Sequence, residues 1–384
     1  MAQSEKSADI VIVGGGILGL CTAFYLAQAG PLKISLLERD LLAQASTGLS
    51  VGGIRQQFSH PANIRLSQMT LELFSRFEEA LGRSLEFHRV GYLFMAQKEQ
   101  TWHSFGESVR TQQELGVPVD ILSAGELRRR WPFLNTDDLL GGTYCAQDGY
   151  ADPYSVAMAF ADAARALGVS IVENTRVLAV KAGSGGVRGV RTTRGTVAAP
   201  IVVNTAGAWA AELAATAGIK LPVMPFRRQV YVTRRFDAIP GPLPLIIDQD
   251  SLFYFRGEGK GILMGMTDPK EPSSFHTHVD RDFLERLIEA AYRRSPVLAQ
   301  AEIQRGWAGL YAITPDENPI IGSLGELDGF FGAVGFSGHG FQHGPSVGRI
   351  LSELILTGKT DFDLNPFSYA RFTQPAGPGE KRTV

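Results

Sequence analysis

Residues 9–38 read DIVIVGGGILGLCTAFYLAQAGPLKISLLE, and this stretch decides the fold. The apolar run Asp9–Val13 is typical of a buried parallel strand. The turn Gly14–Gly19 follows at once and matches G-x-G-x-x-G. Leu20–Gln28 then predicts a helix that a Gly-Pro pair closes, and Lys33–Leu37 predicts a second strand. The sequence therefore predicts a strand–turn–helix–strand unit at the start of an α/β domain.

The glycines of this turn, in this context, favour a dinucleotide-binding site. Glycine permits the tight turn and lets a pyrophosphate approach the backbone, while the helix N-terminus supplies amide donors. Glu38 follows the second strand, nineteen residues after Gly19, where a carboxylate can accept hydrogen bonds from ribose hydroxyls. The same carboxylate would repel the 2′-phosphate of NADP.

Composition narrows the class of protein further. A chain of 384 residues suits two interlocked domains better than a single core. Its net charge of −2 offers no basic field for nucleic acid or anionic lipid. Two distant cysteines, Cys21 and Cys145, favour a reduced compartment. Glycines interrupt the apolar stretch Ile10–Ala29, which argues against a membrane span there. With no signal-peptide pattern in residues 1–8, we expect a soluble cytoplasmic protein without a membrane span.

The segments that follow favour FAD over NAD. Ala45–Arg55 is small, polar and glycine-rich instead of a further strand–helix unit. Val197–Val203 predicts a strand that leads into Asn204–Trp209. Phe330–Val334 predicts another strand, which leads into the glycine-rich loop Gly335–Gln342. That loop could aim amide groups at a reduced flavin, or it could merely turn a corner.

The remaining segments contain signals for four helices and for a polar C-terminal tail. Pro345 is expected to open a helix that Gly358 stops, and Asp152 is expected to cap one that begins at Pro153. Ile64–Leu81 and Asp280–Arg294 are amphipathic. The tail, residues 373–384, is rich in Gly, Pro and charge, and is expected to be disordered.

Several of these motifs together resemble the D-amino-acid-oxidase-type (DAO) family of FAD-dependent oxidoreductases, over nearly the whole chain. They are Ser46–Thr47 with Ser50–Phe58, Gly91–Leu93, Asp148–Pro153, Trp307–Gly322 and Gly335–Gln342. Within the family the chain is similar to the β subunits of sarcosine oxidase and L-proline dehydrogenase. It is also similar to a mitochondrial FAD-dependent oxidoreductase-domain protein tied to complex I assembly.

The resemblance implies a Rossmann-like FAD-binding domain of the glutathione-reductase type. It also implies an α+β substrate domain on a mixed, largely antiparallel sheet, for which residues 227–232 and 252–266 show strand alternation. We expect the FAD-binding domain to be discontinuous, over residues 1–85, 150–215 and 325–384. The substrate domain would comprise residues 86–149 and 216–324.

The motif and the resemblance together suggest which residues contact the cofactor. We expect contacts from Gly14, Gly16, Ile17, Leu18, Gly19, Glu38, Arg39, Ser46, Thr47, Leu49, Ser50, Val177, Ala206, Gly207, Trp209, Gly335, Gly338, Gly340, Phe341 and Gln342. The FAD is expected to be non-covalent. Relatives attach flavin through a cysteine or a histidine, and the matching positions here are Gly309 and Leu49.

The resemblance further implies oxidation of the C–N bond of an amino acid, often a secondary amine, by hydride transfer to flavin N5 and hydrolysis of the imine. Arg55 is the leading clamp for the substrate carboxylate, because a guanidinium binds a carboxylate bidentately. It could instead be a surface arginine or a neighbour of phosphate. Tyr254 and Tyr311 are further catalytic candidates, although Tyr254 could simply pack in the sheet. His339 and Gln342 lie beside the flavin loop.

Two rival functions remain open at this point. One is a flavoprotein scaffold or assembly factor with vestigial catalysis, and the other is an oxidoreductase for 2-hydroxy acids. A partner subunit or a separate electron acceptor is possible, and Leu263 stands where a relative's lysine promotes reaction with oxygen. The spacing His276-x-His278 offers no third ligand, so no metal is expected, and no hydrolase motif is present.

Overall fold

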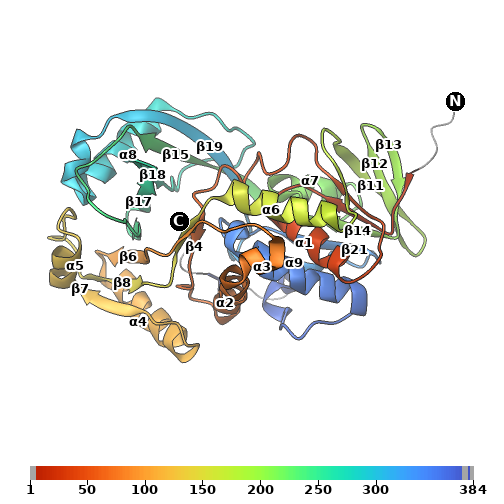
Figure 1. The fold of residues 1–384 in the computed structure, drawn as a ribbon, viewed down its shortest axis with the longest axis horizontal. Helices are drawn as coiled ribbons and strands as arrows, with labels where there is room; N and C mark the ends of the chain where they lie inside the picture. The colour runs from red at the N-terminus through yellow and green to blue at the C-terminus, as the bar shows by residue number, and fades with distance from the viewer. Residues whose placement is uncertain (1–5, 374–378, 381–384) are drawn as a thin grey trace.

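The computed structural model describes residues 6–373 and 379–380. Figure 1 shows two lobes side by side: one carries α1, α6 and α9, and the other carries the strands β15, β17, β18 and β19 with α8. The nine α-helices of the described residues are α1 (Ile17–Gln28), α2 (Pro61–Ser75), α3 (Phe77–Leu81), α4 (Glu99–Glu114), α5 (Ala124–Arg130), α6 (Pro153–Ala166), α7 (Ala210–Ala215), α8 (Arg281–Arg294) and α9 (Gly340–Thr357). Short 3₁₀ turns are η1 (Gly207–Trp209), η2 (Pro296–Gln300), η3 (Asn365–Phe367) and η4 (Tyr369–Thr373).

A six-stranded sheet forms the centre of the first lobe. In spatial order its strands are β10 (Ser170–Val172), β3 (Ile34–Leu37), β2 (Ile10–Val13), β14 (Ile201–Asn204), β21 (Phe330–Val334) and β20 (Ile320–Ser323). All neighbours are parallel except the edge pair β20–β21. Every residue of β2 is buried, as expected of an apolar strand covered on both faces. The predicted Rossmann-like start of the chain is confirmed.

Helices α1 and α9 pack closely on this sheet because glycine lets their backbones approach. A Cβ on Gly348 of α9 would lie 2.6 Å from the Cβ of Cys21 in α1, and one on Gly344 would lie 2.7 Å from Ile17 Cγ1. Any larger residue there would push the two helices apart. Helix α6 begins at Pro153 with Asp152 as its N-cap, as predicted.

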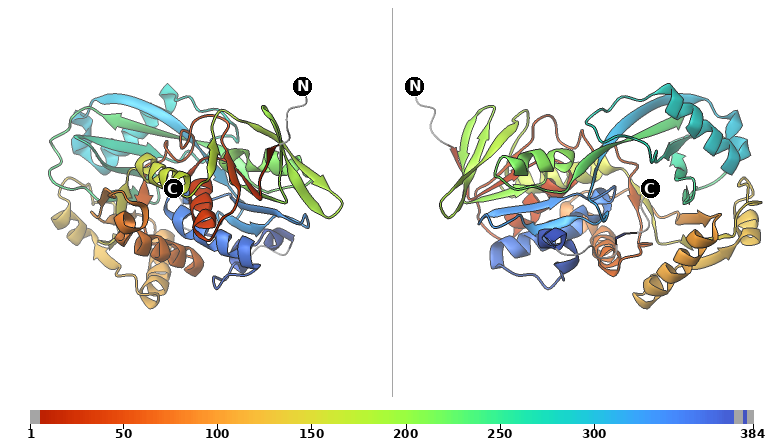
Figure 2. Two further views of the ribbon diagram at one scale, coloured as in Figure 1. Left: turned by 45° about the vertical axis from the view of Figure 1, so that its right-hand side comes forward. Right: turned by 180° about the vertical axis from the view of Figure 1, so that it is seen from behind.

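The second lobe is built on an eight-stranded sheet. Its order is β19 (Ile303–Ile313), β15 (Met224–Thr233), β18 (Gly261–Met266), β17 (Phe253–Glu258), β16 (Leu245–Asp248), β6 (Tyr92–Ala96), β8 (Gly141–Cys145) and β7 (Asp120–Ser123). Only β16 and β6 are parallel neighbours, so the prediction of a mixed, largely antiparallel sheet is confirmed. Seen from behind in Figure 2, the long strands β15 and β19 run toward the first lobe.

Two smaller sheets complete the strands. One is four-stranded, in the order β1 (Lys6–Ser7), β13 (Gly195–Ala198), β12 (Gly186–Thr192) and β11 (Val177–Gly183). The other is three-stranded, in the order β4 (Gly53–Ile54), β9 (Gly149–Ala151) and β5 (Phe87–His88). The three-stranded sheet joins the segment after the glycine-rich turn to the Asp148–Pro153 motif.

Several predicted element boundaries were wrong. Residues 197–203 do not form one strand, because Pro200 cannot donate to a ladder and the chain passes there from β13 in one sheet to β14 in another. The helix predicted from Pro345 begins five residues earlier, at Gly340, and accommodates Pro345 in its second turn. The predicted helix 64–81 begins at Pro61 and breaks at Arg76.

Most of the tail predicted to be disordered lies outside the described residues. Gly379 and Glu380 are described, however, and Glu380 is buried. Its carboxylate accepts hydrogen bonds from the Ser59 and His60 amides and from the Asn63 side chain, at the N-terminus of α2. These amides are left over at a helix start and attract an acidic partner. For this pair of residues the prediction of disorder was wrong.

Cys21 and Cys145 are both buried, and neither forms a disulfide. Each lies in a different core cluster. None of the helices in the described part of the chain is long and apolar enough to cross a membrane.

Candidate active site

A long cavity of about 540 Å³ extends from the glycine-rich turn of the first lobe to the sheet of the second lobe. Its walls come from the turn before α1, the end of β3, residues 43–50, η1, β19 and the loop before α9. Residues distant in the sequence therefore meet around one elongated space.

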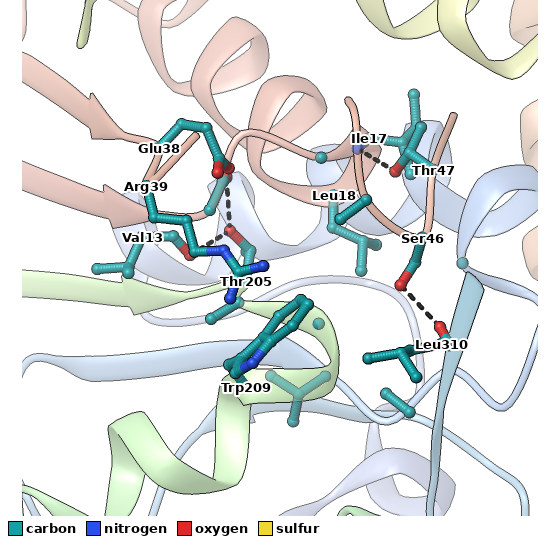
Figure 3. Close-up of a pocket in the computed structure, with 18 of the residues that line it drawn as sticks. Val13, Ile17, Leu18, Glu38, Arg39, Ser46, Thr47, Thr205, Trp209 and Leu310 are labelled. Atoms are coloured by element: carbon teal, nitrogen blue, oxygen red, sulfur yellow. Dashed lines mark hydrogen bonds between the residues drawn. The ribbon is translucent and has the colours of Figure 1, made fainter. Parts of the chain in front are cut away.

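The glycine-rich turn forms one end of this cavity. Gly14 has φ +113°, and a Cβ there would lie 2.5 Å from the Thr205 carbonyl oxygen, so only glycine fits. A Cβ on Gly19 would collide with the Gly14 carbonyl, because Gly19 packs behind the turn. Thr47 Oγ1 accepts a hydrogen bond of 3.1 Å from the Ile17 amide (Figure 3). The N-terminus of helix α1 faces the cavity. Because its first turn has no acidic residue, no side chain of that turn offsets the positive end of the helix dipole.

Glu38 stands at the end of β3, where the sequence placed it. One carboxylate oxygen accepts from the Gly15 amide at 2.7 Å and the other from the Asp40 amide at 2.9 Å. Each oxygen retains a lone pair for another donor, such as a ribose hydroxyl. The carboxylate is thus held in a fixed orientation against the cavity.

A stack of side chains closes the same end. The Arg39 guanidinium lies over the Trp209 ring (Figure 3), 3.5 Å from its centre. Trp209 stacks on Phe275 with ring centres 5.6 Å apart. A cation over an indole face is attracted by the ring quadrupole. Phe275 and Thr277 come from the loop before α8, so this stack bridges the two lobes.

The other end of the cavity lies over β19. Ser46 Oγ donates a 2.7 Å hydrogen bond to the Leu310 carbonyl, and Trp307 Nε1 donates at 3.0 Å to the Leu49 carbonyl. A Cβ on Gly309 would lie 3.1 Å from the Leu49 Cβ, so glycine permits the close approach of this loop. The segment 43–50 is thereby pinned across the sheet.

The structure places nearly all of the predicted cofactor residues on this cavity. Lining residues among them are Gly14, Gly16, Ile17, Leu18, Glu38, Arg39, Ser46, Thr47, Leu49, Ser50, Val177, Ala206, Gly207, Trp209, Gly335, Gly338, Gly340 and Phe341. Gly19 does not line it, and Gln342 lines a second pocket. A long cavity with a glycine turn, a helix N-terminus and a fixed carboxylate at one end fits FAD.

A second, smaller pocket of about 60 Å³ opens beside the long cavity. Ser50, Tyr311, Ser337, Gly338 and Phe341 line both spaces, so the two are contiguous. All five predicted catalytic residues lie on it, namely Arg55, Tyr254, Tyr311, His339 and Gln342.

Arg55 is buried, which excludes the alternative of a surface arginine. Its backbone amide donates to Gln342 Oε1 at 2.7 Å, and its Nη1 donates to the Gln57 carbonyl at 2.5 Å. The guanidinium lies 3.8 Å from the centre of the Phe58 ring. Burial lowers its pKa, but a guanidinium remains charged at neutral pH.

The contact between Arg55 and His339 fixes the form of the imidazole. Arg55 Nη2 lies 3.3 Å from His339 Nε2, and because a guanidinium can only donate, Nε2 accepts. Burial, then the Arg55 charge, hold the pKa of His339 well below its usual value, so the ring is neutral. Its proton is therefore on Nδ1, which has no hydrogen-bond partner among the described residues. His339 thus presents a donor and not a base.

Two buried tyrosines lie on the pocket. The ring of Tyr254 lies across Gly265, where a Cβ would collide with it, and a Cβ on Gly338 would lie 2.5 Å from the Tyr311 ring. Burial is the main cause that raises the pKa of both hydroxyls, so both stay protonated and can donate. Tyr254 packs in the sheet and also lines the pocket, so its packing role does not exclude contact with a substrate.

Sequence reasoning gave no role to Asp148 or Tyr92, although both belong to quoted motifs. Asp148 is fully buried and accepts from the Gln56 amide at 3.0 Å and from the Gln57 side chain at 3.3 Å. Burial raises its pKa to about 6. Tyr92 lines the pocket, and burial raises the pKa of its hydroxyl, so it stays protonated. The sequence carried no separate signal for Asp148, because its burial is visible only in the fold.

His276 and His278 pack edge to face, with ring centres 5.4 Å apart. Across the described residues, no group of three or more His, Cys, Asp or Glu side chains could hold a metal ion.

Comparison with known proteins supports this description. The family model described as "DAO: FAD dependent oxidoreductase" matches residues 9–354. The chain is 34% identical to FAD-dependent oxidoreductase domain-containing protein 1 of Xenopus laevis, over 96% of this chain and 83% of that protein. It is 30% identical to human mitochondrial sarcosine dehydrogenase, where it spans 96% of this chain but only 42% of the relative.

Solved structures agree in fold. L-proline dehydrogenase from P. horikoshii superposes with a TM-score of 0.89 at 32% identity, covering 96% of this chain and 98% of that one. The match extends across both lobes and therefore across both cavities. The chain belongs to the DAO family of FAD-dependent oxidoreductases, and FAD is its cofactor.

Proposed function

We propose that the protein oxidises the C–N bond of a small amino acid, of the secondary-amine type, with the substrate in the small pocket. The observation that carries this proposal is the convergence of Arg55, Tyr254 and Tyr311 on a small buried pocket that is contiguous with the FAD-shaped cavity. The protein names sarcosine dehydrogenase and L-proline dehydrogenase, found among the relatives, point to the same class.

Arg55 binds the substrate carboxylate in this proposal. It is the one charged residue among the described residues that line the small pocket, so the pocket favours an anion. Its position is fixed by Gln342 on one side and Gln57 on the other, which limits the reorganisation needed on binding. The neutral His339 lines the same pocket, with its Nε2 turned to Arg55 and its Nδ1–H without a partner among the described residues.

The same charge pattern selects the protonation state of the substrate. A nearby guanidinium and a buried pocket without a carboxylate on its lining both disfavour an ammonium group. The amine is therefore bound more readily in its neutral form, whose lone pair assists loss of hydride from the adjacent carbon. A bound flavin supplies the acceptor for that hydride, while the protein orients the substrate and excludes water.

We also propose that the FAD is held without a covalent bond. The described residues that line the long cavity include no cysteine and no histidine. The division into a discontinuous FAD-binding domain and a substrate domain, at the boundaries given above, is part of the same proposal. Strands β6, β7 and β8 share a sheet with β15–β19, which supports their assignment to one domain.

The test is anaerobic reduction of the purified holoprotein by single compounds. Sarcosine, L-proline, glycine, N-methylated amino acids and 2-hydroxy acids are each mixed with the oxidised protein, and flavin absorbance is followed. Bleaching by a secondary amino acid supports the proposal. Bleaching by 2-hydroxy acids alone contradicts it, and no bleaching by any compound favours a non-catalytic flavoprotein.

A further inference from the structure

Three buried polar atoms in the second lobe, one in a strand of the eight-stranded sheet and two just beyond strand ends, have no hydrogen-bond partner among the described residues. They are Arg228 Nε, Thr267 Oγ1 and Gln249 Oε1. Most buried polar groups in folded proteins are hydrogen-bonded, and an exception calls for a missing partner. Three such unpartnered atoms in one lobe could share a single missing partner if they lie close together.

The strand register places these three residues in a single row. In β15 and β18, Gln229 pairs with Met266, so the next residues, Arg228 and Thr267, are opposite each other. On the far side of β18, Thr267 donates its amide to the Leu252 carbonyl at 3.2 Å. Leu252 in turn is opposite Gln249, since Phe253 pairs with Asp248. The row therefore runs from Arg228 in β15, past the end of β18 at Thr267, to Leu252 and Gln249 in the turn that joins β16 to β17.

Two members of the next row of the sheet, Tyr254 and Ile247, line the small pocket. Val230, Gly265, Tyr254 and Ile247 are successive partners across β15, β18, β17 and β16, each two residues from a member of the polar row. Residues two apart on a strand point to the same face. Tyr254 and Ile247 line the pocket, so the polar row lies next to its lining, although Arg228, Thr267 and Gln249 themselves line neither cavity.

Arg228 also approaches the pocket through Tyr311. Its guanidinium lies 5.0 Å from the centre of the Tyr311 ring, and Tyr311 lines both cavities. The charges of Arg228 and Arg55 both act on the Tyr311 hydroxyl, so this tyrosine lies near both guanidiniums. Arg228 Nη1 donates to the Arg227 carbonyl at 3.0 Å. Burial raises the pKa of the Glu317 carboxyl, and the charge of Arg228 offsets part of this rise.

These groups together suit a second carboxylate. A guanidinium Nε–H and a threonine hydroxyl can donate to its oxygens, and the glutamine amide can turn its NH₂ toward it. We propose that Arg228, Thr267 and Gln249 recognise a second acidic group of the substrate, while Arg55 holds the first. The preferred substrates are then amino acids with two carboxylates, the second on the N-substituent or on the side chain. This inference rests on the proposed function and names its substrate class.

Two matched pairs of compounds test it on the holoprotein. Sarcosine and iminodiacetate differ by a carboxylate on the N-substituent, and N-methyl-L-alanine and N-methyl-L-aspartate differ by one on the side chain. We expect the dicarboxylic member of at least one pair to reduce the flavin with the higher kcat/KM. Arg228→Gln should lower the dicarboxylic-to-monocarboxylic ratio of kcat/KM by about 10- to 100-fold, the range of a lost charge-assisted hydrogen bond.

Thr267→Val removes the hydroxyl without altering size, and carries the test if Arg228→Gln does not fold. It should lower the same ratio by about fivefold, the range of a lost neutral hydrogen bond. Arg234→Gln is the matched control, because this arginine follows β15 with its side chain 67% exposed. An unchanged ratio in both variants overturns the inference, as does a wild-type preference for the monocarboxylic member of both pairs. In either case, reduction by the monocarboxylic compounds leaves the proposed function standing, whereas reduction by none of the four and by no other secondary amino acid, L-proline included, contradicts both.

Discussion

Asp148 should make the stability of the protein depend on pH. It is fully buried, and its carboxylate accepts from the Gln56 amide, the Gln56 side chain and the Gln57 side chain. Burial raises its pKa from 3.8 to about 6 and outweighs these hydrogen bonds, which lower it. The folded protein therefore binds this proton more tightly than the unfolded chain does.

The sign and size of the effect follow from proton linkage. Because the folded-state pKa is raised, the stabilisation is fully present below pH 3.8 and is lost as the pH rises through about 6. The shift from 3.8 to about 6 corresponds to roughly 3 kcal/mol, at about 1.4 kcal/mol per pKa unit. About 2 kcal/mol of this falls between about pH 4.5 and pH 7.

Asp148→Asn removes the titration, so the variant should gain stability relative to the wild type by about 2 kcal/mol between these two pH values. Urea unfolding of both proteins at about five pH values measures the difference. Asp137→Asn is the control, because the Asp137 side chain is 81% exposed and the variant should run parallel to the wild type. A difference between Asp148→Asn and wild type that stays flat over this range would refute the reasoning.

Three further predictions concern the site. Arg55→Ala should keep FAD but lose about 2–4 kcal/mol of transition-state binding, read from kcat/KM, and Arg55→Lys should recover only part; unchanged efficiency in the alanine variant would remove Arg55 as the clamp. Acid precipitation should release all the flavin, because Gly309 and Leu49 cannot form the bonds that relatives use; yellow colour left in the washed pellet would contradict this. The reduced flavin should pass electrons to a quinone or dye faster than to oxygen, because Leu263 offers no positive charge to superoxide; reoxidation by air faster than turnover, with stoichiometric peroxide, would make the protein an oxidase.

The cofactor cavity could be predicted from sequence because its determinants are local. Gly14, Gly19 and Glu38 have fixed spacing along one strand–turn–helix–strand unit, and that spacing determines where each lies in space. The structure places Gly14 and Glu38 on the cavity and Gly19 behind the turn. All three residues are needed in this strand–turn–helix–strand unit, but only Gly14 and Glu38 line the cofactor cavity.

Residues whose roles depend on distant strands could not be found in this way. Arg228 and Thr267 are 39 positions apart, and only the register of β15 against β18 brings them together. In the sequence, Arg228 is one of two adjacent arginines with no motif to separate them. Its neighbour Arg227 instead forms ion pairs with Glu271 and Asp280, which shows that alternate strand positions lead to opposite faces.

The segment that carries Arg55 shows why tertiary contacts decide the substrate pocket. Gln342 holds the Arg55 amide, Asp148 holds the amide and side chain of the next residue, and Glu380 binds the amides that start α2. These three anchors come from positions 92 to 321 residues away in the sequence. The guanidinium is thereby fixed before any substrate arrives, so little ordering is required on binding. An arginine in a free glycine-rich loop would lose that advantage, even with the same local sequence.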